Sequence, residues 1–152
     1  MDTFRRSQLV MEMLRHAANG NRDETMRVLV HIAQACDGQQ MYNVCCGIAD
    51  AARQSLIKLY GHPSPEGLWA LAAPDPDEGC QHPAHTFALR FVSSYSNGDM
   101  ETCSALYLAA YRASPADYGH SVTALIGLAG YLARAAAEEL AANRDQPASH
   151  PH

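Results

Sequence analysis

The segment 80–85, which reads CQHPAH, holds the densest group of side chains that could bind a metal. The thiolate of Cys80 and the imidazoles of His82 and His85 can fill three of the four positions around Zn²⁺, and His62 could supply the fourth. Established zinc motifs combine two spaced ligand pairs, and no second cysteine pair stands in an expected loop. The alternative is a solvated loop with histidines near a helix N-terminus, so both interpretations stay open.

Two carboxylate–histidine pairs lie on other expected helices. Glu12 and His16 are four residues apart, and Asp117 and His120 are three apart, so each pair shares one helix face. Helical bundles build metal sites from inward Glu-x-x-His motifs on two helices, and that motif is missing from this sequence. We therefore expect surface pairs or helix caps at these positions.

The cysteines do not form a disulfide framework or a nucleophilic motif. There are five, an odd number, and Cys36, Cys45, Cys46 and Cys103 all fall within helical patterns. Such residues act as small buried hydrophobes in a reducing compartment. Adjacent Cys45 and Cys46 point about 100° apart on a helix, which disfavours a bridge between them. The sequence also lacks a nucleophile elbow, a phosphate-binding glycine loop and a dinucleotide fingerprint.

Three large side chains are candidates for contact with a ligand or partner. Trp69 is the only tryptophan, and it lies with Leu68 in a short amphipathic helix that Ser64-Pro65-Glu66 would open. Trp69 either anchors this segment to the core or acts as an interface hot spot. Tyr107, on a later helical stripe, is the third candidate.

Apolar residues at helical spacing predict an all-α protein with six main helices plus the short one. Strand signals are nearly absent. The main helices are expected within 2–20, 23–38, 41–61, 84–97, 100–113 and 115–143. The second is apolar around most of its circumference, with His31 on a narrow polar edge, so we expect it to be the most enclosed. Gly119, Gly127 and Gly130 form a small-residue strip expected to permit close helix packing.

The pattern predicts one domain over residues 1–143, with helical halves 2–61 and 84–143. A connection with five prolines, residues 62–83, joins the halves, and a disordered tail is expected over 144–152.

A repeated phrase suggests that the two halves are a duplication. Asn19-Gly20 is followed by Glu24-Thr25, and Asn97-Gly98 by Glu101-Thr102, each between two helical stripes. Fixed self-similarity indicates repeats, although these residues are also common helix punctuation. The stretch 98–115, with small and aromatic residues at Cys103, Tyr107 and Ala110, resembles the second half of a tetratricopeptide unit. That resemblance covers less than one repeat, because Phe91 stands where the family keeps a small residue and no 34-residue period appears.

Charge and hydropathy exclude two classes of partner. The net charge is −5, Lys58 is the only lysine, and the arginines form no stripe that could neutralise several phosphates, so nucleic acid is not expected. No apolar run approaches the ~20 residues of a membrane span. The segment after Arg5 and Arg6 lacks a secretory apolar region, so we expect a cytoplasmic protein.

The leading functional hypothesis is a non-enzymatic helical module that binds a protein partner or itself. Apolar helices are abundant, and no polar set converges in the sequence. The second hypothesis is a small-ligand or metal-binding regulatory protein that uses the connection 61–85. A third is an enzyme with a site assembled from distant residues such as His31, Tyr42 and Asp50. No cofactor is required by the first hypothesis, whereas zinc belongs to the second.

Overall fold

A computed structural model describes residues 1–63, 69 and 82–145, and this part of the chain is all-α, as the sequence predicts. It contains no strand, and its six helices are α1 (Thr3–Ala18), α2 (Arg22–Ala35), α3 (Gly38–Tyr60), α4 (Pro83–Ser96), α5 (Met100–Arg112) and α6 (Pro115–Asp145). None of these helices is long and apolar enough to cross a membrane. The expected short helix, Leu68, Cys80 and residues 146–152 lie outside the described residues.

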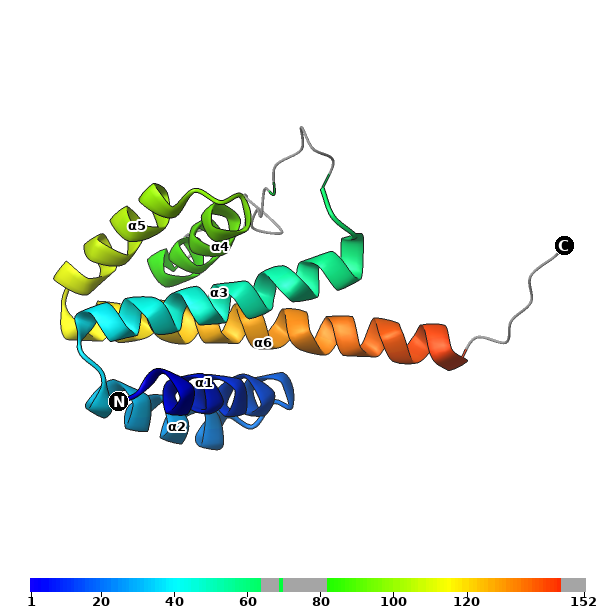
Figure 1. The fold of residues 1–152 in the computed structure, drawn as a ribbon, viewed down its shortest axis with the longest axis horizontal. Helices are drawn as coiled ribbons and strands as arrows, with labels where there is room; N and C mark the ends of the chain where they lie inside the picture. Colours follow the sequence, from blue (N-terminus) through cyan, green and yellow to red (C-terminus); the bar gives the residue numbers. More distant parts are fainter. Residues whose placement is uncertain (64–68, 70–81, 146–152) are drawn as a thin grey trace, which may run out of the picture.

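The two long helices form the centre of the fold (Figure 1). α3 and α6 pack side by side and run in the same direction, with their N-terminal ends together. The α1–α2 hairpin covers one side of this pair, and the α4–α5 hairpin covers the other. Each half of the chain therefore supplies a hairpin followed by a long helix. This shared order is compatible with a duplication, which stays a prediction.

The repeated Asn-Gly phrase forms the same turn in both hairpins. Gly20 and Gly98 adopt φ values of 74° and 75°, a left-handed conformation in which glycine is the least strained residue. The next residues, Asn21 and Asp99, cap α2 and α5 by accepting backbone N–H groups at 3.3 and 3.1 Å. The repeated phrase therefore specifies helix–turn–helix geometry.

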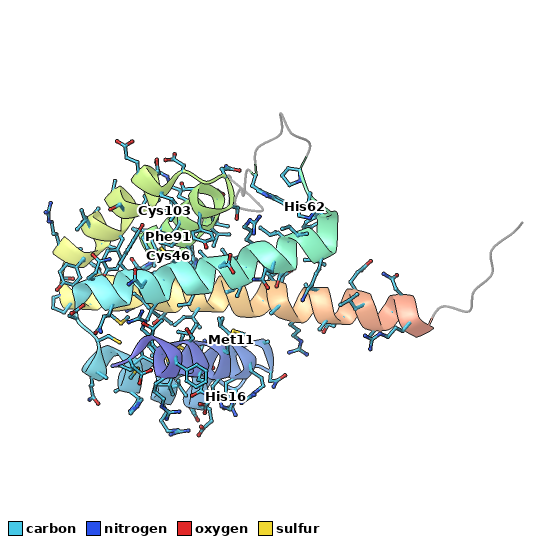
Figure 2. The ribbon with its side chains drawn as sticks, viewed as in Figure 1. Met11, His16, Cys46, His62, Phe91 and Cys103 are labelled. Carbon is cyan, nitrogen blue, oxygen red and sulfur yellow. The ribbon has the colours of Figure 1, made fainter. Side chains whose placement is uncertain are left out.

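The core follows the apolar stripes of the sequence, and its centre lies around Phe91. This side chain is fully buried, and the Cys103 thiol donates to the Phe91 carbonyl oxygen at 3.8 Å. Figure 2 shows Cys103, Phe91 and Cys46 gathered between the α4–α5 hairpin and α3. Most apolar residues at helical spacing on α1, α3 and α4 are buried, including Met13, Ile48 and Val92, whereas Ala17, Leu59 and Tyr95 are half-buried.

Two sequence expectations about α2 are wrong. It is a peripheral helix, because it packs mainly on α1 and leaves His31 exposed and Val30 49% exposed. It also ends at Ala35, whereas Gly38 begins α3. The reason for the second error is the capping box of α3, in which the Asp37 carboxylate accepts the Gln40 N–H at 2.8 Å and the Gln40 side chain accepts the Asp37 N–H at 3.0 Å.

The small-residue strip of α6 permits close packing at one position only. A β-carbon on Gly130 would lie 2.8 Å from the β-carbon of Ala17 and 3.0 Å from its carbonyl carbon, so glycine is needed where α6 crosses α1. By contrast, β-carbons on Gly119 and Gly127 would find no atom within 4 Å. Gly127 instead lies beside a groove.

Candidate functional site

An open groove of about 1160 Å³ lies where α6 passes between the α1–α2 turn and the start of α4. Its lining comes from residues within 17–26, 82–89 and 120–131, and we call it the histidine groove. Three chain segments that are distant in sequence meet there, with α6 contributing residues of one face at helical spacing. The groove therefore depends on the tertiary packing of α1, α2, α4 and α6.

Three histidines gather in this groove. The His82 ring lies 6.2 Å from the His85 ring and 5.4 Å from the His120 ring, centroid to centroid, and it meets the latter edge-on. His82 and His85 belong to the predicted metal cluster, whereas His120 is predicted to pair with Asp117. The Asp117 N–H is bonded to the Ser114 hydroxyl at 3.1 Å as part of the α6 cap, and the His120 ring faces α4. Neither the sequence around His82 nor the sequence around His120 predicts that α6 packs beside the start of α4.

The His82 imidazole presents a hydrogen-bond donor to its surroundings. Its Nδ1 atom accepts the Ala84 backbone N–H at 3.1 Å and so caps α4. A neutral imidazole has one protonated nitrogen and one acceptor, so Nε2 must carry the proton when Nδ1 accepts. A metal needs a nitrogen lone pair, and this capping bond already uses the only one.

The described residues do not form the predicted zinc site. Among them, no three His, Cys, Asp or Glu side chains are placed to share one metal ion. His62 is exposed beyond the C-terminal end of α3 (Figure 2), and Cys80 lies outside the described residues. His82 is therefore a poor zinc ligand, because its lone pair already accepts the Ala84 N–H. A zinc site that includes Cys80 stays a prediction.

The groove has basic and apolar walls. Arg22, at the start of α2, lines it together with the three histidines, and no Asp or Glu occurs among its described lining residues. This charge pattern differs from that of the whole chain, which has 16 acidic residues against 11 Lys and Arg and a net charge of −5. Apolar side chains such as Met26, Leu89 and Leu128 supply much of the remaining surface, and Tyr131 is 70% exposed.

A second group of polar rings, which we call the tyrosine cluster, lies at the N-terminal ends of α3 and α6. It consists of Tyr42, Tyr107, Tyr111 and Tyr118, whose neighbouring ring centroids lie 5.3–6.0 Å apart. The Tyr107 hydroxyl donates to the Gly38 carbonyl at 2.7 Å and lies 3.1 Å from the Tyr118 hydroxyl. Burial raises the pKa of Tyr42 to about 12 and also raises the pKa values of Tyr107 and Tyr118. These phenols therefore stay neutral and join the helices.

The thiols of this region are poor nucleophiles. Burial, with a smaller contribution from the nearby Cys46, raises the pKa of Cys45 to about 12 and that of Cys103 to about 11. The Cys46 pKa is also raised by burial, against the opposing effect of a hydrogen bond with Tyr42. Since the thiolate is the reactive form, these high pKa values are typical of structural cysteines. All four described cysteines are free.

The predicted partner-contact residues have different surroundings. Trp69 is half-buried against the core, and the Asn97 side chain holds its backbone by accepting the Trp69 N–H at 2.7 Å and donating to its carbonyl at 2.9 Å. These contacts support the anchoring interpretation. Tyr107 is also predicted to contact a ligand or partner, but its ring belongs to the tyrosine cluster and only 4% of the residue is exposed, so its contact with a partner stays a prediction. Leu68 lies outside the described residues.

The residues of the enzyme hypothesis do not converge. His31 is exposed on α2, whereas Tyr42 belongs to the tyrosine cluster on α3. Asp50 accepts hydrogen bonds from Gln54 at 2.8 Å and from the Tyr95 hydroxyl at 3.2 Å. Each of these side chains therefore serves a separate surface or contact.

No family model, curated protein or solved structure matches this chain. Its function is therefore inferred from the geometry and chemistry of the histidine groove. In this groove polar side chains remain accessible beside apolar ones, whereas the tyrosine cluster satisfies its central polar atoms internally.

Proposed function

We propose that this protein is a helical interaction module whose histidine groove binds an amphipathic, acidic helix of a partner protein. The observation that carries the proposal is the composition of the groove. It combines an apolar surface with Arg22 and three histidines, and it contains no carboxylate among its described lining residues.

The open form of the groove favours a helix over a small molecule. Small-ligand sites are typically enclosed and bury 70–90% of the ligand surface. The histidine groove has a volume of about 1160 Å³ and is partly open to solvent. An amphipathic helix inserts only its apolar face into such a groove and keeps its polar face in water.

Charge complementarity indicates which helix fits. Arg22 lies on the side of the α1–α2 turn, whereas His82 and His85 lie on the side of α4, with α6 between them. Glutamates that flank the apolar face of a bound helix would meet basic donors on both sides. Such pairing mainly sets orientation and excludes basic helices, while the apolar contacts stabilise the complex.

Gly127 offers a direct test because a side chain there would enter the groove without disturbing the core. A β-carbon on Gly127 would contact nothing within 4 Å, and the same is true of Gly47 on α3, which is exposed outside the groove. Gly127→Trp should therefore block the groove, and Gly47→Trp is its matched control. The probe is a fluorescein-labelled peptide of about 18 residues, long enough to form a helix, with leucines at i, i+3, i+4 and i+7 flanked by glutamates.

Fluorescence anisotropy should show saturable binding of this peptide to the natural protein and to Gly47→Trp. Binding to Gly127→Trp should be at least about tenfold weaker, because a buried anchor position typically contributes that much or more. A version of the peptide with lysines in place of the glutamates should also bind at least about tenfold more weakly. Equal binding to the two tryptophan variants, or no saturable binding at all, would refute the proposed function.

A further inference from the structure

We infer that His82, His85 and His120 form an oxyanion-binding site within the histidine groove, which takes a carboxylate or phosphate group. The inference rests on the proposed function and deepens it, because it identifies the group on the partner that binds at this end of the groove. The shared chemistry is that of an anionic oxygen that accepts N–H hydrogen bonds.

The first step is the convergence of the three rings. His82 contacts both other rings, at centroid distances of 6.2 Å to His85 and 5.4 Å to His120. All three residues are exposed on the groove and come from the cap and first turn of α4 and from the second turn of α6. One small group that enters the groove can therefore reach more than one imidazole.

The second step is the protonation pattern. Because His82 Nδ1 accepts the Ala84 N–H, His82 Nε2 carries a proton and acts as a donor. Among the described residues, nothing donates to or accepts from the imidazoles of His85 and His120, so each can turn an N–H toward a ligand. Three N–H donors match the lone pairs of an oxyanion, and protonation of any ring adds a charge-assisted bond.

The third step is the neighbourhood, which favours an anion over a cation. The exposed Thr123 hydroxyl lines the same groove and can add a donor, whereas the Thr25 hydroxyl already donates to the Asn21 carbonyl at 2.7 Å. Arg22, on the other wall of the groove, supplies a permanent positive charge. The described lining contains no carboxylate that would repel an anion or hold a cation. A bound metal would instead require the His82 cap on Ala84 to break.

The experiment follows the imidazole nitrogens of the ¹⁵N-labelled full chain by NMR during titration with sodium acetate and with inorganic phosphate. Ionic strength is held constant with sodium chloride. The resonances of His82, His85 and His120 should shift along one saturation curve, and His82 should be protonated on Nε2. His16 and His31 lie outside the groove and should shift little.

Two substitutions at exposed positions of the site should keep the fold intact and separate the contributions of the rings. His82→Asn removes the imidazole but retains a good helix cap, and His120→Gln removes an exposed ring. Each should weaken the binding of acetate and phosphate by about tenfold, which is the usual effect of losing one charge-assisted hydrogen bond. His31→Gln is the matched control and should leave both affinities unchanged.

The outcomes also distinguish this site from the proposed function. If the glutamate peptide binds the natural protein and His120→Gln equally well, and acetate and phosphate cause no saturable shift, the oxyanion site is refuted while the groove proposal stands. If acetate or phosphate binds but the peptide does not, the source of the anion is a free small molecule, and the interaction proposal fails. Stoichiometric Zn²⁺ binding that displaces the Ala84 N–H from His82 would overturn the oxyanion assignment in favour of a metal.

Discussion

The tyrosine cluster and the histidine groove are both made of polar rings where α6 meets other helices, yet they differ in what their polar atoms contact. In the tyrosine cluster, the Tyr107 hydroxyl bonds to the Gly38 carbonyl and lies within hydrogen-bond distance of the Tyr118 hydroxyl. In the histidine groove, the rings of His85 and His120 bond to no other described residue. The hydrogen-bond partners of a polar ring, more than its residue type, therefore distinguish a structural contact from a binding surface.

Burial gives the same contrast. Only 4% of Tyr107, at the centre of the tyrosine cluster, is exposed, although the outer Tyr111 is 50% exposed. The histidines and Tyr131 of the groove are all open to solvent. A buried ring contributes to the stability of the fold, and an accessible one is available to a partner. Changes at the buried Tyr107 should therefore alter stability, and changes at the exposed histidines of the groove should mainly alter binding.

The largest effect is expected from high pH, which ionises several groups in and beside the tyrosine cluster together. Cys45 and Tyr42 have pKa values raised to about 12 by burial, and the pKa values of Tyr107 and Tyr118 are raised as well. Since the folded state favours the neutral forms, their stabilising contribution is complete below the ordinary pKa values of about 8.5 for thiols and about 10 for phenols. It is then lost as pH rises toward the folded-state values.

Urea denaturation followed by circular dichroism should therefore show a midpoint that falls steadily from about pH 8 to about pH 11. In Tyr42→Phe, which removes one of the titrating phenols, the decline should be smaller. A midpoint that is constant over this range would show that the cluster does not depend on neutral phenols and thiols.

The next largest effect is expected from truncating one ring in each region. Tyr107→Ala removes a buried ring and two hydroxyl contacts, so it should lower the free energy of unfolding by about 3–5 kcal/mol. His120→Ala removes an exposed ring and should change stability by no more than about 0.5 kcal/mol. Urea unfolding of both variants measures the difference. Similar losses in the two would contradict the distinction between a closed and an open region.

A smaller effect should separate two glycines that lie three residues apart on α6. Gly130→Ala forces a β-carbon against Ala17 and should destabilise the protein by about 1–3 kcal/mol. Gly127→Ala meets only open groove and should stabilise it by about 0.5–1 kcal/mol, because alanine is the better helix former. Thermal unfolding of the two variants measures the difference in their stabilities. A loss of stability in Gly127→Ala would show that other atoms pack closely against Gly127.

Local sequence signals predict the fold well because helix ends have specific chemistry. The left-handed glycines Gly20, Gly61 and Gly98 follow the expected helix ends, and the inward stripes of α1, α3 and α4 are buried. The ranking of helices by enclosure was wrong for α2, since its apolar circumference includes exposed Val30. Enclosure depends on which helices are long enough to occupy the centre, and the 23-residue α3 and 31-residue α6 have that role.

The candidate site could be predicted only in part. The cluster around His82 and His85 was visible in the sequence as a local spacing, but its third member was not. His120 joins the cluster because α6 packs beside the start of α4, and no local pattern encodes that contact. The donor character of His82 likewise depends on its capping bond to Ala84. The sequence predicts a helix that begins near His82, but it does not determine which nitrogen of the imidazole accepts the cap.

The most direct test of the account is hydrogen–deuterium exchange of the full chain with and without a saturating amount of the glutamate peptide. If the histidine groove is the binding surface, protection should increase in segments 17–26, 82–89 and 120–131. Segments 38–46 and 103–118, which carry the tyrosine cluster, should exchange as before. Protection centred on the tyrosine cluster, with no change at the groove under saturating peptide, would contradict the account.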